Sequence, residues 1–430
     1  MPTFCVIQLA RFGDVLQTGR LLRSLLAEPG AGVHLCVDRS LERMAALAFP
    51  GVVVHGLRAH GAPGASGPGG GGAAELVREN RAVFAELAAL APDAVYNLNF
   101  SGGNFAVAAL FDPAIVRGHR MAAGQPLKDD WTRLAFRWTR DRRTSPCNLV
   151  DFWAHLAPRP LAPQAVNPAA EPKGGGLGVV LAGRNARRSL PPDVLALCVQ
   201  VVLERLGRAR APRIILLGTE AERPYARDLK GELPASLRDR VDDMAGKTDW
   251  DALFDTVGGL DVALTPDTGT MHLAAHLGTP VEAFFLASAW AWETGPYGAG
   301  HRVWQAVADC APCVENRPCP CAAACLAPFR SREFLRLATG RQGDPPVGMV
   351  GLDSGHDALG ATFSAAHGVD PAASARAARR ALLAEWLGLP PAPSSTGEGM
   401  PDERAAAVDA LFQDRDWMLP PDNHQLEECC

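Results

Sequence analysis

Two stretches of this chain alternate short apolar runs with segments of helical periodicity, and this alternation restricts the fold more than any other feature. In the first stretch, apolar runs at residues 5–9, 33–37 and 52–55 are separated by helical spacing at 15–26 and by a further helical segment. A strand, a helix and a second strand in this order are typical of a parallel sheet covered by helices. The N-terminal part is therefore expected to be α/β.

The alternation restarts after a segment rich in Pro, Ala and Gly at residues 158–178. We expect strands at 177–181, 213–217, 261–265 and 281–285, with helices at 193–206 and 269–277. A length of 430 residues also favours two domains over one. The sequence therefore predicts Rossmann-like domains at 1–165 and 175–330.

Residues 331–430 lack a strand signal and are expected to form a helical or partly disordered extension. Its helices are predicted at 375–386 and 402–412, on either side of a linker rich in Pro, Ser and Gly. In the N-terminal domain, residues 61–74 consist largely of Gly, Pro, Ala and Ser, which predicts a flexible loop.

The composition excludes several classes of protein. Apolar residues make up 47% of the chain and charged residues 21%, as in soluble globular proteins. The net charge of −5 argues against a protein whose main partner is nucleic acid, because such proteins need a basic face. The most apolar region, 262–292, is interrupted by charged residues and histidines and does not predict a membrane span. Because the N-terminus also lacks signal-peptide features, we expect a cytoplasmic protein.

The first expected strand leads into the sequence Arg11-Phe12-Gly13-Asp14. The carboxyl ends of parallel strands are where α/β sheets bind ligands. Asp14 has two interpretations: it caps the following helix, or its carboxylate is a general base that takes a proton from a hydroxyl group. Gly13 is expected to allow the tight turn that directs this carboxylate.

Residues 261–280 contain another strand, turn and helix, and the turn reads Asp267-Thr268-Gly269-Thr270-Met271-His272. Asp267 or Thr268 is expected to cap the helix. The free N–H groups at the start of a helix suit a diphosphate, and Gly269 lets such a ligand approach the backbone closely. His272 lies in the first turn, where it would add a donor to the same anion. The alternative is an ordinary capped helix with a surface histidine.

Neither turn contains the Gly-x4-Gly-Lys-Ser/Thr pattern of nucleoside triphosphatases, and no Gly-x-Gly-x2-Gly follows the first strand. The sequence therefore disfavours dinucleotide redox chemistry. One turn in each domain suits a donor diphosphate in one domain and an acceptor in the other. We expect the two turns to face each other across a cleft.

Five blocks follow one another along the chain: Arg-Phe-Gly-Asp at 11–14, Leu-Leu-Gly-Thr-Glu at 216–220, Ala-Gly-Lys-Thr at 245–248, Pro-Asp-Thr-Gly-Thr-Met-His-Leu-Ala at 266–274 and Thr-Gly-Pro-Tyr-Gly at 294–298. In this order and spacing they resemble the lipopolysaccharide heptosyltransferase family, also called glycosyltransferase family 9. The resemblance extends over about residues 3–325 and implies a GT-B fold, with the acceptor bound by 1–165 and the donor by 175–330.

The resemblance further implies inverting, metal-independent transfer of a heptose or a similar sugar from an ADP-sugar, with no cofactor required for catalysis. The implied acceptor is a lipopolysaccharide core or a related lipid-linked glycan. An acceptor of this kind implies that the cytoplasmic protein also contacts the inner face of the cytoplasmic membrane. Asp14 would be the general base. The donor would be bound by Asp267, Thr268, Gly269, His272, Gly218, Thr219, Glu220 and Glu222.

The chain departs from the family after the first strand of the second domain. Relatives usually carry a Lys followed closely by Trp there, whereas residues 183–190 read Gly-Arg-Asn-Ala-Arg-Arg-Ser-Leu. Arg187 or Arg188 would bring the same charge to the donor phosphates in a different geometry. The alternative is that both arginines belong to a solvated turn.

Five of the eleven cysteines lie within one short segment, at Cys310, Cys313, Cys319, Cys321 and Cys325. Such density in a reducing compartment is typical of metal sites, and four thiolates suffice for structural zinc. A redox-sensitive or disulfide-forming loop and inert thiols are the alternatives. A catalytic metal is not expected, because no His or carboxylate joins the set.

Two other functions stay open on the residues alone. One is a catalytically inactive protein of the same fold that binds a nucleotide-sugar or a glycan, and the other is a nucleotide-sugar epimerase. Residues 97–104 are expected to contact the acceptor. The basic residues between Arg117 and Arg143 suit an acidic acceptor or an anionic lipid, or else form a solvated helical face.

Overall fold

The computed structural model describes residues 1–59, 73–181, 186–207, 211–313, 318–319 and 321–390, together with Ala405 and Val408. The predicted loop at 61–74 and the predicted helix at 402–412 therefore lie almost entirely outside the described residues. The chain forms two compact units. Unit 1 comprises Met1–Phe136 and Leu149–Ala162, and unit 2 comprises Arg137–Asn148 and Pro163–Cys430.

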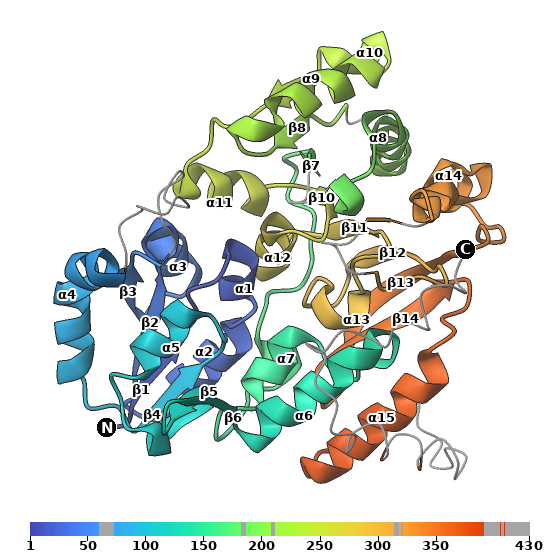
Figure 1. Ribbon diagram of the computed structural model, residues 1–430. Helices are drawn as coiled ribbons and strands as arrows, with labels where there is room; N and C mark the ends of the chain where they lie inside the picture. Colours follow the sequence, from blue (N-terminus) through green and yellow to red (C-terminus); the bar gives the residue numbers. More distant parts are fainter. Residues whose placement is uncertain are drawn as a thin grey trace. The chain divides into compact units, whose positions relative to one another are not determined.

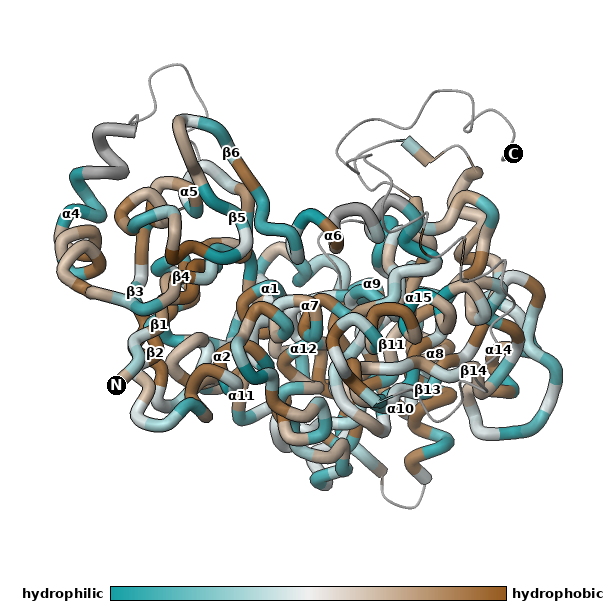
Figure 2. The backbone as a smooth tube through the Cα atoms, turned by 90° about the horizontal axis from the view of Figure 1, so that it is seen from below, coloured by the Kyte–Doolittle hydropathy of each residue, from teal (hydrophilic) through white to brown (hydrophobic). Residues whose placement is uncertain are grey.

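Unit 1 is built on a six-stranded sheet in the order β3-β2-β1-β4-β5-β6 (Figure 1). All neighbouring strands are parallel except the last pair, β5 and β6, which is antiparallel. Figure 2 shows hydrophobic stretches along β1 and β4, which are central in this order. The strands are β1 (Thr3–Ile7), β2 (Gly32–Asp38), β3 (Val53–Leu57), β4 (Ala94–Asn97), β5 (Val116–Ala122) and β6 (Gln125–Lys128).

Helices α4 and α5 cover one face of this sheet. Buried Ile7 and Val95 on the strands pack with Leu87 of α4 and Val107 of α5 in one apolar cluster. The helices of unit 1 are α1 (Phe12–Leu16), α2 (Gly19–Leu26), α3 (Glu42–Ala48), α4 (Ala73–Ala89), α5 (Gly102–Ala108) and α7 (Leu149–Ala154), with 3-10 turns η1 (Arg39–Leu41) and η2 (Pro113–Ile115), while α6 (Asp130–Trp138) ends in the first residues of unit 2.

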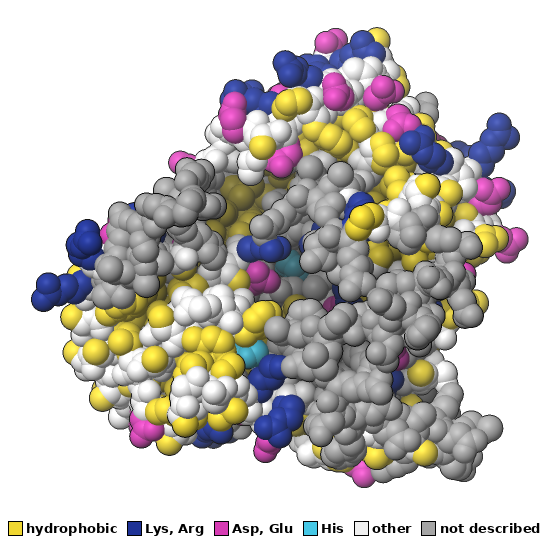
Figure 3. Space-filling model, viewed as in Figure 1, with side chains coloured by type: hydrophobic (Ala, Val, Ile, Leu, Met, Phe, Trp, Pro, Cys, Tyr) yellow, Lys and Arg dark blue, Asp and Glu magenta, His cyan; other side chains and the backbone are white. Residues whose placement is uncertain are grey.

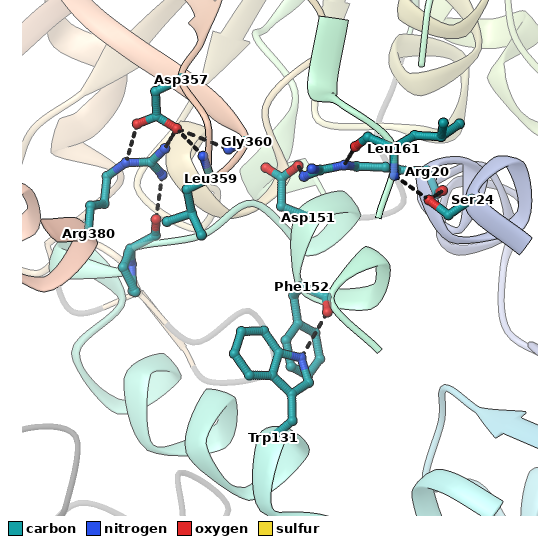
Figure 4. Close-up of polar contacts among 11 residues, drawn as sticks. Arg20, Ser24, Trp131, Asp151, Phe152, Leu161, Asp357, Leu359, Gly360 and Arg380 are labelled. Atoms are coloured by element: carbon teal, nitrogen blue, oxygen red, sulfur yellow. Dashed lines mark hydrogen bonds and ion pairs between the residues drawn. The ribbon is translucent and has the colours of Figure 1, made fainter. Parts of the chain in front are cut away.

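A buried ion pair joins α2 to α7 inside unit 1 (Figure 4). The guanidinium of Arg20 donates to Asp151 Oδ1 at 2.6 Å and to the Leu161 carbonyl at 2.9 Å. The side chains of Arg20 and Asp151 are only 2% and 0% exposed. The returning segment Leu149–Ala162 is thus tied to the first half of the unit by charge as well as by packing.

Unit 2 has an eight-stranded sheet in the order β14-β13-β12-β11-β10-β7-β8-β9. The strands from β12 to β9 are parallel, and β13 and β14 add an antiparallel edge. They are β7 (Leu177–Val180), β8 (Ile214–Leu217), β9 (Val241–Asp243), β10 (Val262–Pro266), β11 (Val281–Phe285), β12 (Arg302–Ala306), β13 (Met349–His356) and β14 (Ala361–His367).

Helices α8, α9 and α14 share one apolar cluster with the strands of this sheet, through Val199, Leu229 and Phe334. Charged side chains of both signs gather over α9 and α10, at the top of Figure 3. The helices are α8 (Pro192–Leu206), α9 (Arg223–Glu232), α10 (Ala235–Arg238), α11 (Trp250–Gly258), α12 (Gly269–His276), α13 (Ala291–Thr294), α14 (Arg332–Ala338) and α15 (Ala373–Trp386), with 3-10 turns η3 (Thr139–Thr144), η4 (Pro163–Ala165), η5 (Ala186–Arg188), η7 (Glu220–Glu222) and η8 (Ala324–Arg330). Among the described residues, no helix is both long and apolar enough to cross a membrane.

The prediction of two Rossmann-like α/β domains is confirmed, and the expected strands and helices outside the C-terminal region occur within a few residues of their predicted bounds. The description of 331–430 as lacking strands is wrong, because β13 and β14 extend the sheet of unit 2. A Cβ on Gly351 of β13 would come within 2.7 Å of the ring of Trp304 on β12. This strand therefore depends on a small residue beneath a large aromatic neighbour, which weakens its apolar signal.

The basic stretch from Arg117 to Arg143 is not one helical face. Arg117 and Arg120 lie on β5 and Lys128 on β6, while the remaining basic residues follow on α6 and η3. The alternating outward residues of a short edge hairpin account for the polar sequence.

The segment 137–148 belongs to unit 2 although unit 1 surrounds it in sequence. Three arginines of α15 hold it. Arg376 donates to the Arg143 carbonyl, Arg379 donates to Asp141 at 3.2 Å, and Arg380 donates to the Pro146 carbonyl while pairing with Asp357 (Figure 4).

Candidate functional site

The topological switch of unit 2 lies between β7 and β10. From β7 the chain continues to β8 and β9 on one side, and β10 then joins the other side of β7. Ligands of open α/β sheets bind outside the carboxyl ends of the strands at such a point. Two predicted donor-binding segments follow these strand ends: the turn η5 follows β7, and the turn into α12 follows β10.

The start of α12 is capped by Thr268. Its backbone is extended, with φ −146° and ψ 167°, and its hydroxyl accepts the Met271 N–H at 3.4 Å. Asp267 is therefore not the cap, and its carboxylate is left for side-chain contacts. Gly269 is the first residue of the helix, where no side chain limits access to the free N–H groups.

Asp267 gathers three side chains. Thr294 Oγ1 donates to its Oδ2 at 3.2 Å, an Arg188 guanidinium nitrogen lies 3.4 Å from the same oxygen, and His272 Nε2 lies 3.9 Å from Oδ1. The structure thus brings together Asp267, Thr268, Gly269, His272 and Arg188 among the predicted donor-binding residues. His272 is not a surface residue, since its side chain is 8% exposed.

A second buried carboxylate, Glu293, lies in the electrostatic range of Asp267. The Arg142 Nε donates to Glu293 Oε2 at 2.7 Å, and another Arg142 nitrogen donates to the Ser288 carbonyl at 3.3 Å. Sequence reasoning missed Glu293, and it placed Arg142 only in the basic stretch expected to meet an acidic acceptor or an anionic lipid. The only signal was indirect: Glu293 directly precedes the Thr-Gly-Pro-Tyr-Gly block.

Burial is the largest influence on the pKa values of the Asp267 and Glu293 carboxyl groups. It raises the pKa of Asp267, although the charge of Arg188, the Thr294 hydrogen bond and the charge of Arg142 act in the opposite direction. It also raises the pKa of Glu293, where Arg142 opposes the shift and the charge of Asp267 adds to it. The site thus holds two acids and two arginines in a region sheltered from water.

The two candidate arginines have different neighbours. Arg188 pairs with Asp267, whereas Arg187 lies beside the thiols of Cys313 and Cys319. Its charge opposes the rise that burial causes in the pKa of Cys313 and adds to the lowering of the pKa of Cys319. Of the two arginines, Arg188 is therefore the one with a structural link to the α12 turn.

The second predicted donor-binding turn, Gly218 to Glu222, meets the Ala-Gly-Lys-Thr block. The Gly246 N–H donates to the Gly218 carbonyl at 2.9 Å, and a Cβ on Gly246, which has φ +67°, would come within 2.9 Å of the Glu220 Cα. Glu222 stabilises the turn in which it lies, because its carboxylate accepts the Thr219 N–H at 2.6 Å. Glu220 instead forms an ion pair with Arg223 at 2.7 Å.

Asp14 of unit 1 lies in the five-residue helix α1. It is not the N-cap that the sequence suggested as one interpretation: the cap is Arg11, and the Asp14 carboxylate accepts the Arg11 N–H at 3.1 Å. Gly13 lies inside the helix, so the expected tight glycine turn is wrong. Asp14 is partly exposed at the carboxyl end of β1, as a base acting on a ligand must be.

The predicted acceptor loop at 97–104 is only partly accessible. Asn97 and Asn104 are fully buried; Asn97 donates to the His119 carbonyl at 2.8 Å and Asn104 donates to Asn97 Oδ1 at 2.8 Å. These two residues hold the loop in shape. Phe100 at its tip is 43% exposed and remains accessible to a ligand.

All described cysteines are free thiols, including the five of the cluster. Among the described residues, no group of three or more His, Cys, Asp or Glu side chains is arranged to hold a metal ion. Structural zinc therefore stays a prediction, to be checked by metal analysis of the purified protein. The terminal pair Cys429-Cys430 lies outside the described residues.

Cys319 is expected to be the most reactive thiol of the cluster. The Ala323 N–H donates to its sulfur at 3.3 Å, and this contact, together with Arg187, lowers the pKa of Cys319, whereas burial raises the pKa values of Cys310 and Cys313. Because the thiolate is the nucleophile, brief iodoacetamide treatment at pH 7 should label Cys319 first, as read by peptide mass spectrometry. Earlier labelling of Cys310 or Cys313 would contradict this assignment.

Residues 201–322 match the model of glycosyltransferase family 9, the heptosyltransferases. Lipooligosaccharide heptosyltransferase 2 of Haemophilus influenzae is 29% identical over 72 residues, which is 17% of this chain. The matched region spans only 21% of that relative's length.

Solved structures of the same family share the fold. E. coli ADP-heptose LPS heptosyltransferase II is 17% identical with a TM-score of 0.50, over 70% of this chain and 90% of that one. A family 9 glycosyltransferase from Veillonella parvula is 14% identical with a TM-score of 0.52, over 70% and 85% of the two chains. E. coli heptosyltransferase WaaC with ADP is 18% identical with a TM-score of 0.50, over 70% and 92%. Residues 201–322 of this chain thus resemble glycosyltransferase family 9, and the chain shares the GT-B fold of these structures.

Proposed function

We propose that this protein is an inverting, metal-independent glycosyltransferase that moves a heptose or a similar sugar from an ADP-sugar to a lipopolysaccharide core or a related glycan. The observation that carries the proposal is the turn between β10 and α12. It collects Asp267, Thr268, His272 and Arg188 at the switch point of the sheet, within the segment 201–322 that matches the model of glycosyltransferase family 9 or next to it.

In this proposal the donor diphosphate lies at the N-terminus of α12. The helix N–H groups, His272 and Arg188 stabilise the negative charge that grows on the diphosphate as its bond to the sugar breaks. Asp267 lies beside the sugar, and the turn of Gly218, Thr219 and Glu220 lies near the ribose or the base. The choice of ADP is supported by the E. coli relative solved with that nucleotide.

At the acceptor end, Asp14 takes the proton from the attacking hydroxyl group. The hydroxyl oxygen bonds to the anomeric carbon from the side opposite the diphosphate, so the configuration inverts as the diphosphate leaves with its electron pair. The base contributes because the attacking oxygen loses its proton as the new bond forms.

The acceptor is proposed to be a lipid-linked glycan at the inner face of the cytoplasmic membrane. The edge hairpin of unit 1 supports this assignment: Arg117 is exposed on β5, and Leu127 of β6 is 39% exposed. An apolar and basic edge suits an anionic lipid surface or the phosphates and carboxylates of a glycan.

The donor is tested by adding ADP-, GDP- and UDP-sugars to the purified protein and measuring the melting temperature, followed by a transfer assay with and without EDTA. We expect stabilisation by ADP-sugars above the other two classes, and transfer that EDTA does not change. Stabilisation without any turnover would favour the inactive sugar-binding protein of the same fold, and loss of transfer with EDTA would contradict metal independence.

Replacing Arg188 by Met is expected to weaken donor binding by about 10- to 150-fold, because hydrogen bonds to charged groups contribute about 1.5–3 kcal/mol. The matched control is Arg187→Met, which removes a neighbouring charge that faces the cysteines. Titration calorimetry with the best donor of the panel compares the two variants. An equal loss in both would show that Arg188 has no special place at the diphosphate.

A further inference from the structure

Four charged side chains form a continuous row beneath the α12 turn. Their order is Arg142, Glu293, Asp267 and Arg188, with an arginine at each end. The two carboxylates in the middle are neighbours, because Thr294, the residue after Glu293, donates to Asp267 Oδ2 at 3.2 Å and the two acidic charges interact. The side chains of Glu293 and Asp267 are 9% and 8% exposed, so water screens their repulsion poorly. With both acids ionised, the row is neutral only while both arginines stay.

The two ends of the row are held differently. At one end Arg142 donates to Glu293 at 2.7 Å and to the Ser288 carbonyl, and its backbone segment is clamped by Arg376, Arg379 and Arg380 of α15. At the other end the Arg188–Asp267 pair is longer, at 3.4 Å. Arg188 is also 25% exposed and sits in the short turn η5, next to the proposed diphosphate.

We propose that a nucleotide-sugar diphosphate takes Arg188 away from Asp267 when it binds, and that the Asp267–Glu293 carboxyl pair takes up one proton from solvent in exchange. This inference rests on the proposed function, because it needs the diphosphate to bind beside Arg188.

The proton follows from charge balance. Once Arg188 faces the diphosphate, two adjacent buried carboxylates share the single positive charge of Arg142. Two carboxylates in such a position cannot both stay ionised at low cost, which is why one member of a close acidic pair has a strongly raised pKa. Burial already raises the pKa of both groups, so removing one arginine adds to an existing shift.

The groups that face the pair come from four elements. Arg142 comes from η3, Arg188 from η5, His272 from α12 and Thr294 from α13. His272 is the other group that takes up a proton near neutral pH. The experiment must therefore separate uptake by the carboxyl pair from uptake by this histidine.

The test is titration calorimetry with ADP-glucose, whose diphosphate has no proton to lose near neutral pH. Binding heats in PIPES and in Tris at the same pH differ by the number of protons taken up multiplied by the difference in buffer ionisation enthalpy. We expect the native protein to take up a proton and to lose affinity as pH rises, approaching tenfold per pH unit where uptake is complete. Binding with no proton uptake between pH 6 and pH 9 would overturn the inference and leave the proposed function intact.

Variants that change the charge of the row should change proton uptake in a pattern that a purely structural role of these residues would not produce. Glu293→Gln leaves Arg142 to balance Asp267, so proton uptake should disappear. The double variant Glu293→Gln/Arg142→Met removes that balance again, so uptake should return. If the single variant fails to fold, proton uptake can still be measured in the native protein and in the double variant, which removes one negative and one positive charge and so keeps the net charge.

His272→Gln is the control for the histidine and should leave the uptake in place. If uptake is lost in His272→Gln and kept in Glu293→Gln, the proton belongs to His272 and the inference is wrong. If neither ADP-glucose nor GDP- or UDP-sugars bind at all, the proposed donor site fails and the inference fails with it.

Discussion

Replacing Asp14 by Asn is expected to lower kcat for sugar transfer by about 10²- to 10⁴-fold, because a positioned general base contributes about that factor. The asparagine oxygen can still accept the Arg11 N–H that the carboxylate accepts at 3.1 Å, so the start of α1 should keep its shape. Proton transfer occurs only in the transition state, and the loss should therefore appear in kcat with donor affinity unchanged.

The measurement combines initial rates of transfer with the donor-induced shift in melting temperature. Asp93→Asn is a matched control in the same unit, since that carboxylate accepts the Thr3 N–H at 2.7 Å and lies at the opposite end of β1. It should transfer at the native rate. Near-native turnover in Asp14→Asn would remove the carboxylate from the mechanism and leave it only its hydrogen bond to Arg11.

Replacing Arg20 by Met is expected to lower the free energy of unfolding of unit 1 by about 3–5 kcal/mol, because it removes the guanidinium that pairs with a buried carboxylate. Asp151 is 0% exposed, and Arg20 also holds the Leu161 carbonyl. Urea denaturation followed by circular dichroism measures the loss.

The double variant Arg20→Met/Asp151→Leu should recover most of that stability, because it removes both charges and keeps the volume apolar. Arg159→Met is the surface control: it breaks the pair with Glu28 by removing a guanidinium that is 74% exposed, and it should change the stability little. A double variant as unstable as Arg20→Met alone would mean that the hydrogen bond to Leu161 or the packing of α2 against α7, rather than the loss of the ion pair, decides the stability.

The fold was predictable from the sequence where each element has its own local signal. β1, β7 and β8 are almost continuous apolar runs because parallel strands are buried on both faces, and β2, β10 and β11 are apolar runs interrupted by His34, Thr265 and Glu282 respectively. β13 has no such signal, since Gly351 must stay small under the ring of Trp304, a neighbour from another strand. Edge strands such as β5 and β6 are missed for a related reason, as their outward side chains are polar.

The candidate site divides in the same way. A cap at Asp267 or Thr268 and His272 in the first turn follow from a contiguous strand, turn and helix, which a single sequence displays, whereas the choice of Thr268 over Asp267 comes from the structure. Arg142 and Glu293 meet across 151 positions, and nothing local to either residue indicates the other. The sequence also did not distinguish Arg187 from Arg188, because which of two adjacent arginines faces the α12 turn depends on the conformation of η5.

The clamp of α15 on residues 137–148 has a consequence for how the chain is made. Arg143 leaves the ribosome 233 residues before Arg376, the partner that binds its carbonyl group. At about 5–20 residues per second, that interval is about 10–50 s. Residues 149–162 can join α2 early in this time, whereas the segment just before them must wait until the end of synthesis. In newly made chains the basic segment 137–148 is therefore exposed, and chaperones or proteases can bind it before α15 does.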